Sequence, residues 1–191
     1  QLLDVREPAD FAGAHLAGSI DIGLGGSYAT WAGTLLDPAR EIVIIAEPGR
    51  EEEAATRLGR IGFDRVAGYL EGGMAALDAR PDLVGRLERV TAPTLADQLA
   101  SGAPPFVLDV RTESEWAESR IEGSVNVPLN HLQERLDEVP RDRPVVVHCA
   151  TTYRATIAAG LLELDGFADI STLVGGIGAW EASRLATSAS A

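Results

Sequence analysis

Apolar and polar positions along the chain fall into two alternating patterns. Residues 42–46 (Ile-Val-Ile-Ile-Ala) and 145–149 (Val-Val-Val-His-Cys) form short, continuous apolar runs rich in β-branched side chains, which are typical of strands covered on both faces. After each run, apolar residues recur at i, i+4 and i+7, as expected for one buried face of a helix. These faces comprise Ala54, Leu58 and Ile61 after the first run and Ile157, Leu161 and Leu164 after the second. The alternation of strands and helices predicts an α/β fold with parallel sheets flanked by helices.

The same landmarks occur twice along the chain. Leu-Asp-Val-Arg at 3–6 recurs at 108–111, and Gly-Ser-Ile at 18–20 recurs as Gly-Ser-Val at 123–125. Further strands are predicted at 65–70 and 170–174, and each of them ends in a Gly-Gly pair before a helix. This self-similarity predicts two domains, at 1–80 and 90–185, joined by a linker between Arg80 and Arg89.

The two copies differ at their ends. The second has a lead-in at 94–99, with Thr94 as the expected N-cap of a helix, and the first has no counterpart of it. We therefore expect the natural protein to extend upstream of Gln1. The tail from Ala186 onward is rich in Ser and Ala and is predicted to be disordered.

Charge and composition narrow the possible partners. The 191 residues are 46% hydrophobic and carry a net charge of −13, with basic residues scattered along the sequence, so nucleic acid is excluded as an expected partner. No apolar run approaches the roughly 20 residues needed to cross a bilayer. A single cysteine forms no internal disulfide and fits a reducing compartment, which makes the cytoplasm the expected location.

The candidate chemistry lies at Cys149, at the carboxyl end of a predicted buried strand, where open α/β sheets bind ligands. Successive amides of the following loop can turn inward toward the sulfur and favour a thiolate, helped by the positive end of the next helix. Arg154 would add a forked donor for an anionic group. The expected substrate-binding residues are Ala150, Thr151, Thr152, Tyr153 and Arg154.

Such a thiolate is suited to attack on sulfur, which would give a cysteine persulfide that a second thiol relieves. Because the chain has no second cysteine, the acceptor must be another molecule or lie in an upstream portion. A free cysteine at a strand end can also be an inert small hydrophobe. The loop and Arg154 favour the reactive interpretation.

These segments together resemble tandem rhodanese-like sulfurtransferase domains over nearly the whole chain. The resemblance rests on the Leu-Asp-Val-Arg strand end, the Glu-x-x-aromatic and Gly-Ser segments, the Cys-x4-Arg loop and the closing Gly-Gly-x-x-x-Trp. It implies a parallel five-stranded sheet flanked by helices in each domain, the first being truncated at its N-terminus. It also implies a persulfide at Cys149, with the loop amides and Arg154 binding a small-molecule sulfur donor.

Two departures from the family pattern affect these expectations. The family usually has Gly where Thr152 stands, and a β-branched residue does not comfortably adopt the left-handed turn that Gly allows. In the first copy Ala46 occupies the nucleophile position, and the Glu47 carboxylate is expected to intrude where anions would bind. The first domain is therefore predicted to be inactive.

The segments at 31–36 and 46–54 also resemble the rhodanese portion of fusions with a metallo-β-lactamase-like hydrolase or persulfide dioxygenase. That resemblance implies an upstream metal-dependent domain in the same chain. The three histidines, His15, His131 and His148, are far apart and have no ligand partners at metal-site spacing. We therefore expect no metal and no cofactor in this segment.

Several residues and functions have alternative interpretations. His148 should point away from Cys149 by strand alternation and is interpreted as a buried histidine rather than a base. Asp109 and Arg111, which recur as Asp4 and Arg6, are interpreted as a loop-bracing pair. A cysteine phosphatase would need Cys-x5-Arg instead of the Cys-x4-Arg found here. A non-catalytic interaction or sensing module is the third possible function.

Overall fold

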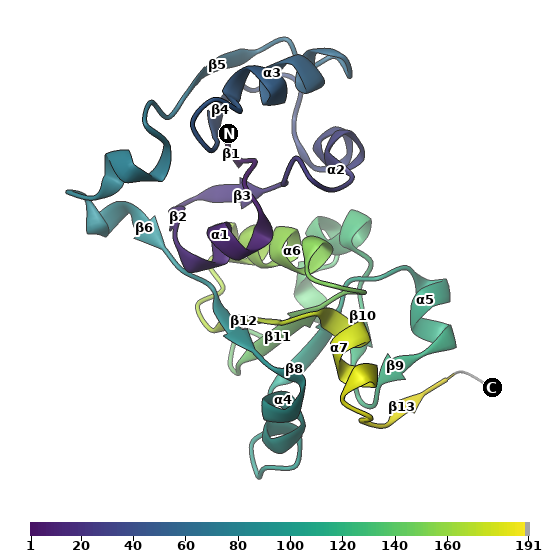
Figure 1. Ribbon diagram of the computed structural model, residues 1–191. Helices are drawn as coiled ribbons and strands as arrows, with labels where there is room; N and C mark the ends of the chain where they lie inside the picture. Colours follow the sequence, from purple (N-terminus) through teal and green to yellow (C-terminus); the bar gives the residue numbers. More distant parts are fainter. Residues whose placement is uncertain (190–191) are drawn as a thin grey trace. The chain divides into compact units, whose positions relative to one another are not determined.

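The computed structural model describes residues 1–189, which form two compact units divided after Arg86. The second unit contains a five-stranded sheet in the order β10-β8-β11-β12-β7, and all four strand pairings are parallel (Figure 1). Its strands are β7 (Glu88–Val90), β8 (Phe106–Asp109), β10 (Val125–Asn126), β11 (Val145–His148) and β12 (Ile170–Leu173). β11 therefore lies in the middle of the sheet, where a continuous apolar strand is expected.

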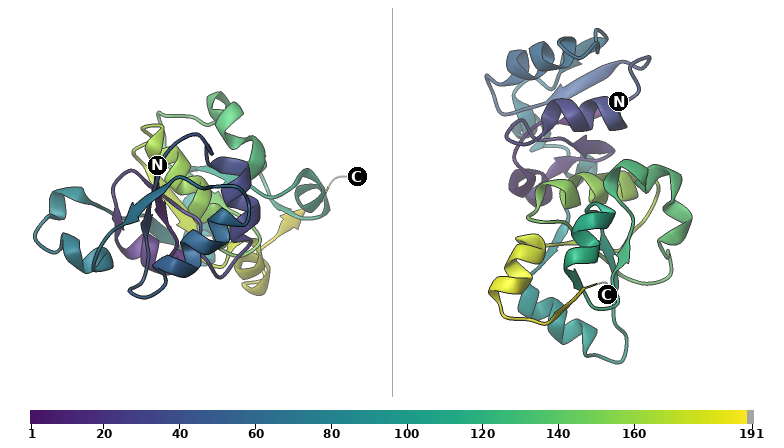
Figure 2. Two further views of the ribbon diagram at one scale, coloured as in Figure 1. Left: turned by 90° about the horizontal axis from the view of Figure 1, so that it is seen from above. Right: turned by 90° about the vertical axis from the view of Figure 1, so that its right-hand side faces the viewer.

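Helices cover both faces of this sheet (Figures 1 and 2). On one face, Leu95 of α4 (Ala92–Leu99) and Trp180 of α7 (Gly176–Ala182) join Val107 and Val146 in one buried cluster. On the other face, α6 (Tyr153–Leu164) packs on β11 and β12. α5 (Glu113–Glu118), two 3-10 helices, η3 (Leu129–Glu134) and η4 (Leu136–Glu138), and the pair β9 (Arg120–Ile121) and β13 (Thr187–Ser188) complete the unit.

The first unit repeats this plan with a four-stranded parallel sheet in the order β3-β1-β4-β5. Its strands are β1 (Leu2–Asp4), β3 (Ser19–Asp21), β4 (Ile42–Ile45) and β5 (Val66–Tyr69). Its helices are α1 (Pro8–Gly13), α2 (Tyr28–Leu35), α3 (Glu51–Gly59), η1 (Gly73–Leu77) and η2 (Pro81–Leu83). No segment of residues 1–86 takes the place that β7 has in the second sheet. The predicted fold class, two α/β units with parallel sheets flanked by helices, is confirmed.

The chain divides into its two units after Arg86, within the predicted linker, which also contains η2 and β6 (Val84–Gly85). β6 pairs antiparallel with β2 (His15–Leu16). Two other local predictions were wrong. The N-cap of α4 is Thr91, whose side-chain oxygen accepts the amide hydrogen of Thr94. The tail predicted as disordered forms β13, which pairs with β9, and residues 190–191 lie outside the described residues.

The predicted helical faces are buried only over their first two positions. In the second unit Ile157 and Leu161 are buried, whereas Leu164 is 48% exposed at the last position of α6. In the first unit Ile61, which lies beyond the end of α3, is 37% exposed.

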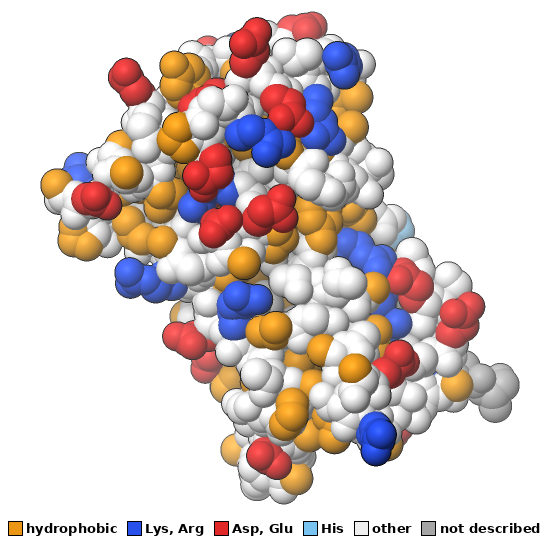
Figure 3. All heavy atoms as spheres, in the orientation of Figure 1, with side chains coloured by type: hydrophobic (Ala, Val, Ile, Leu, Met, Phe, Trp, Pro, Cys, Tyr) orange, Lys and Arg blue, Asp and Glu red, His pale blue; other side chains and the backbone are white. Residues whose placement is uncertain are grey.

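Within residues 1–189, no helix is both long and apolar enough to traverse a bilayer. On the face seen in Figure 3, acidic and basic side chains are interspersed, and the basic ones form no continuous stripe.

The two sheets differ at one position beside the strand that carries the Leu-Asp segment in each repeat. In the second unit Asn126 pairs with Asp109, and its side-chain amide donates to the carbonyl oxygens of Asp109 and Arg111 at 2.9 Å each. In the first unit Asp21 pairs with Asp4 in the same register, is fully buried, and has no hydrogen-bond partner on either carboxyl oxygen. Burial, and next the charge of Asp4, raise the pKa of Asp21 well above its usual range.

Replacing Asp21 with Asn should stabilise the first unit. A carboxyl whose pKa is raised by folding favours the folded state at low pH, and this contribution is lost as the pH rises through the folded pKa. An Asn side chain cannot ionise and can donate as Asn126 does. We expect Asp21→Asn to increase the free energy of unfolding near pH 7 by about 1–3 kcal/mol, measured by urea unfolding.

The increase should shrink as the pH is lowered, because the wild-type carboxyl is then protonated. Asp64→Asn, at an exposed position of the same unit, is the control. Equal effects of the two substitutions at every pH would contradict this account of Asp21.

Candidate active site

Cys149 directly follows β11, the central strand of the second sheet, at its carboxyl end. The cysteine exposes only 1% of its surface, while Thr151 in the loop above it is exposed. The side chain of Cys149 is therefore almost fully enclosed. The sequence correctly placed this residue at the strand end that parallel α/β sheets use for ligands.

The first turn of α7 fixes the direction of the loop peptides. The amide hydrogen of Ile177 donates to the carbonyl oxygen of Cys149 at 2.9 Å, and that of Gly178 donates to Ala150 at 3.2 Å. In a trans peptide the N–H points opposite to the C=O, so the amide hydrogens of Ala150 and Thr151 point away from α7. No backbone or side-chain hydrogen bond within residues 1–189 uses these two amide hydrogens. They are available to an incoming anion.

The Gly-Gly pair before α7 makes this close approach possible. Gly175 and Gly176 have φ values of 73° and 57°, in the left-handed region that favours glycine. A side chain at Gly176 would lie 2.6 Å from the carbonyl oxygen of Thr151 and would also overlap that of Cys149. Gly73 in the first unit has the same relation to Ala46, since a side chain there would lie 2.9 Å from the Ala46 carbonyl oxygen.

Thr152 avoids the strain that the sequence suggested. Its φ of −143° lies outside the left-handed region, and its side-chain oxygen accepts the amide hydrogen of Gly175 at 3.3 Å. Its carbonyl oxygen accepts the amide hydrogen of Thr156 at 3.0 Å. Gly49 stands at the corresponding place in the first unit and has a φ of 90°. It directly precedes Arg50, the N-cap of α3. The two loops therefore turn differently.

Arg154 forms a two-pronged ion pair with Glu115, a residue that sequence reasoning missed. The two terminal guanidinium nitrogens donate to the Glu115 carboxylate at 2.8 and 2.7 Å. Glu115 also caps α5, because its carboxylate accepts from the amide and hydroxyl of Thr112 at 3.0 and 2.8 Å. These contacts, those from Arg154 foremost, lower the pKa of Glu115 to about 2, and the ion pair raises the pKa of Arg154.

A buried charged pair braces the neighbouring strand end in each unit. The Arg111 guanidinium donates to both carboxyl oxygens of Asp109 and to the carbonyl oxygen of Ser119 at 2.6 Å. Arg6 makes the same contacts with Asp4 and with Ala14, at 2.7 Å to its carbonyl oxygen. The predicted loop-bracing role of these residues is confirmed.

His148 is fully buried, as predicted. Its Nε2 lies 3.4 Å from a carboxyl oxygen of Asp109, too far for a good hydrogen bond, and its Nδ1 lies 3.3 Å from the Cys149 carbonyl oxygen. Burial lowers the pKa of His148 although the charge of Asp109 opposes this effect. The ring is therefore neutral at neutral pH.

The loop of the first unit holds a carboxylate of its own. The amide hydrogen of Gly49 donates to the carboxylate of Glu51 at 2.7 Å. Glu47, which was expected to intrude into this loop, is exposed, and Ala46 occupies the place of Cys149. Glu51 is thus the acidic group that engages the loop.

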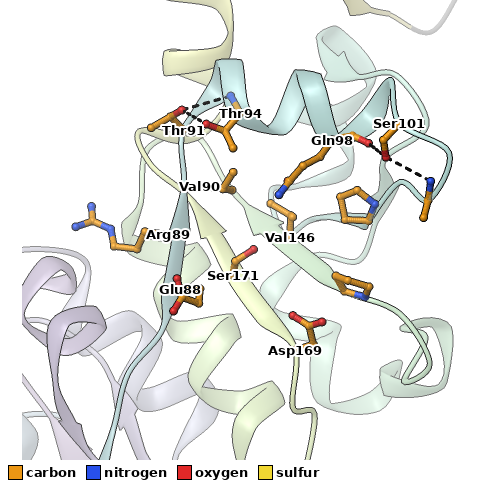
Figure 4. Close-up of a pocket in the computed structure, with 13 residues that line it drawn as sticks. Glu88, Arg89, Val90, Thr91, Thr94, Gln98, Ser101, Val146, Asp169 and Ser171 are labelled. Carbon is orange, nitrogen blue, oxygen red and sulfur yellow. Dashed lines mark hydrogen bonds between the residues drawn. The ribbon is translucent and has the colours of Figure 1, made fainter.

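Two hollows of the second unit lie away from Cys149. One of about 430 Å³, shown in Figure 4, is lined by β7 and the segments around it, with Gln98, Ser101 and Ser171 among its polar residues. Another of about 600 Å³ lies between α4 and α7 and is mostly apolar. Neither includes Cys149 or any residue of its loop, so the thiol chemistry must be judged from the loop itself.

Comparison with known proteins shows to which family the chain belongs. The family model described as the rhodanese-like domain matches residues 1–80 and again residues 91–183. The chain belongs to the rhodanese-like domain family. Both repeats found in the sequence are therefore members of one family, and the two structural units correspond to them.

Relatives of this rhodanese-like chain are named for sulfur transfer. A sulfurtransferase from Allochromatium vinosum is 30% identical over 94 residues, which cover 49% of this chain and 88% of that protein. A thiosulfate sulfurtransferase from Coxiella burnetii is 28% identical over 76 residues, covering 40% and 71% respectively. The structure of thiosulfate sulfurtransferase from Pseudomonas aeruginosa shares the fold, with a TM-score of 0.51 and 23% identity, covering 100% of this chain and 40% of that one. At the level of the family, these relatives support a transferase of sulfur.

Replacing Gly176 with Ala should lower the stability of the second unit and change the conformation of the loop after Cys149. A non-glycine residue in the left-handed region costs about 1–3 kcal/mol, and here the added methyl group also collides with the loop carbonyls. We expect a lower melting temperature and an altered alkylation rate of Cys149. Gly102→Ala is the control, because a side chain there meets nothing within 4 Å. Similar behaviour of the two variants would contradict the proposed role of Gly176.

The Arg154–Glu115 ion pair should make the stability of the protein depend on pH in the acidic range. A carboxyl whose pKa is lowered by folding stabilises the folded state above its unfolded value of 4.5, and this contribution is lost as the pH falls through about 2. Wild type should therefore be more stable than Glu115→Gln at neutral pH, and the difference should vanish toward pH 2. Urea unfolding at several pH values measures this, with the exposed Glu113→Gln as the control. A difference that persists unchanged in acid would contradict the ion-pair explanation.

Proposed function

We propose that the second unit is a sulfurtransferase that works through a persulfide on Cys149. In the first step the thiolate attacks the outer sulfur of a thiosulfate-like or persulfide donor, and sulfite or a thiol leaves with the electron pair. In the second step a thiol acceptor attacks the outer sulfur of the Cys149 persulfide, and the Cys149 thiolate is regenerated. Both steps balance without a cofactor from this segment.

The single observation that carries this proposal is the direction of the loop peptides. Because α7 binds the carbonyl oxygens of Cys149 and Ala150, the amide hydrogens of Ala150 and Thr151 are turned away from it and have no partner within residues 1–189. Such amides stabilise negative charge on a nearby sulfur or on a bound anion. The proposed substrate-binding segment is therefore 150–154, in which Thr152 and Arg154 hold the loop in place and Tyr153 begins α6.

The first unit is proposed to be catalytically inactive. Ala46 offers no nucleophile, and the Glu51 carboxylate already accepts an amide hydrogen of the loop. Negative charge at that point repels an anionic donor. The first unit would then serve a structural or binding role beside the active one.

The remaining parts of the proposal concern the whole protein. We propose that an upstream metal-dependent domain of the same chain exchanges sulfur with Cys149, on the basis of the fusion-like segments at 31–36 and 46–54. A reducing compartment such as the cytoplasm would keep the lone thiol free to react. Reading the natural sequence upstream of Gln1 tests the fusion directly, and a third rhodanese-like unit there would contradict it.

Incubation with a sulfur donor should add one sulfur atom to wild type and none to Cys149→Ser. Intact mass spectrometry measures the added sulfur, and reduction with dithiothreitol should remove it. As a control for the loop, Ala46→Cys combined with Cys149→Ser should accept no sulfur, because the Glu51 carboxylate already occupies an amide of the first loop. Wild type that gains no sulfur from any donor, under conditions where an active sulfurtransferase does, would refute the proposed function.

Two alternative functions can be distinguished from sulfur transfer by phosphatase activity and by the alkylation of Cys149. A phosphatase would hydrolyse an aryl phosphate in a manner that requires Cys149, although the loop is one residue shorter than the Cys-x5-Arg ring suited to a phosphoryl group. A non-catalytic interaction or sensing module would show alkylation of Cys149 that follows the pKa of an ordinary thiol, near 8.5. Either result would replace sulfur transfer as the preferred function.

A further inference from the structure

The charge of the loop arginine is cancelled by a carboxylate that is itself held in place. Arg154 spends both terminal nitrogens on Glu115, and Glu115 accepts two more hydrogen bonds from Thr112 as the cap of α5. For Glu115 to move aside, α5 would lose its capping box as well as the ion pair. Arg154 therefore contributes a neutral pair to the loop, rather than a free positive charge.

Other arginines of the second unit are also engaged with carboxylates. Arg111 is bound to the buried Asp109, Arg135 to Glu138, and Arg141 to Asp165. The charge on Arg111 is compensated within the strand end that it braces. Binding an oxyanion with two negative charges would thus require a cation that the loop residues do not supply.

The turn at Thr152 weakens the loop further as an anion site. Successive backbone amides converge on an anion when a right-handed residue is followed by a left-handed one. Gly49 adopts the left-handed conformation in the first unit, with a φ of 90°, whereas Thr152 has a φ of −143° and is tied by its hydroxyl to Gly175. The loop of the second unit keeps the two turned amides of Ala150 and Thr151 and lacks the left-handed turn.

We propose, on the basis of the sulfur transfer proposed above, that Glu115 and Thr152 select a donor without oxyanion groups, namely an organic persulfide, over thiosulfate. The Cys149 thiolate attacks the outer sulfur of R–S–SH and forms a new S–S bond with it. The S–S bond of the donor breaks, and the rest of the donor leaves as the thiolate R–S⁻. The outer sulfur keeps its proton, so the product is Cys149–S–SH and a free thiolate. Two amides suffice for the single negative charge that is present throughout this step, whereas thiosulfate brings two further charges.

The experiment compares the rate at which wild type gains sulfur from cysteine persulfide and from thiosulfate at equal concentration. Intact mass spectrometry at short times follows the modification of Cys149. We expect loading from the persulfide to be at least roughly tenfold faster, the effect of about one hydrogen bond to a charged group. Glu115→Gln should raise the thiosulfate rate by roughly tenfold and change the persulfide rate less, because Arg154 then carries an uncompensated charge.

Glu113→Gln removes the same charge from an exposed position of α5 and should leave the ratio of the two rates unchanged. Thr152→Gly tests the second feature independently of the ion pair and should also favour thiosulfate. Equal loading of wild type from both donors would overturn the inference, and so would an unchanged ratio in both Glu115→Gln and Thr152→Gly. Absence of loading from either donor would overturn the proposed sulfur transfer itself, and this inference with it.

Discussion

The loop of the second unit depends on two backbone hydrogen bonds, from Ile177 and Gly178 at the start of α7 to the carbonyl oxygens of Cys149 and Ala150. They require the loop and the start of α7 to approach each other so closely that only glycine fits at position 176. Once the carbonyls are fixed, the trans peptide fixes the opposite direction for the amides. The same close approach occurs between Gly73 and Ala46, where there is no nucleophile. The approach is therefore a property of the repeat and does not depend on the cysteine.

The ion pair of Arg154 with Glu115 positions the loop and also compensates the charge of the arginine. Its pair with Glu115 ties the start of α6 to α5, so the segment after the thiol is anchored at both of its ends, by α7 and by α5. The side chains of Arg154 and Glu115 are 20% and 34% exposed, so the pair contributes modestly to stability. Its larger effect is electrostatic, because a guanidinium next to an ionised carboxylate has little attraction left for a third group.

Much of this architecture could be predicted from local patterns. The continuous run before Cys149 and the repeated Leu-Asp-Val-Arg segments gave the parallel sheets, the two units and the position of the thiol, since these depend on strand burial and self-similarity. Glu115 could not be assigned in the same way. Its capping-box spacing from Thr112 is visible in the sequence, but its contact with Arg154 joins residues 39 apart and exists only after folding. The φ of Thr152 and the pairing of β13 with β9 likewise depend on tertiary contacts that no local pattern contains.

The two copies distribute the requirements of an anion-activated thiol between them. The first has the left-handed turn at Gly49 without a nucleophile, and its Glu51 carboxylate accepts the amide that this turn presents. The second has the nucleophile and two free amides, with a different turn at Thr152 and a compensated arginine. In the first loop a carboxylate therefore lies against the backbone amide of Gly49. In the second loop the carboxylate of Glu115 binds the arginine instead, and the amides of Ala150 and Thr151 keep no partner within residues 1–189.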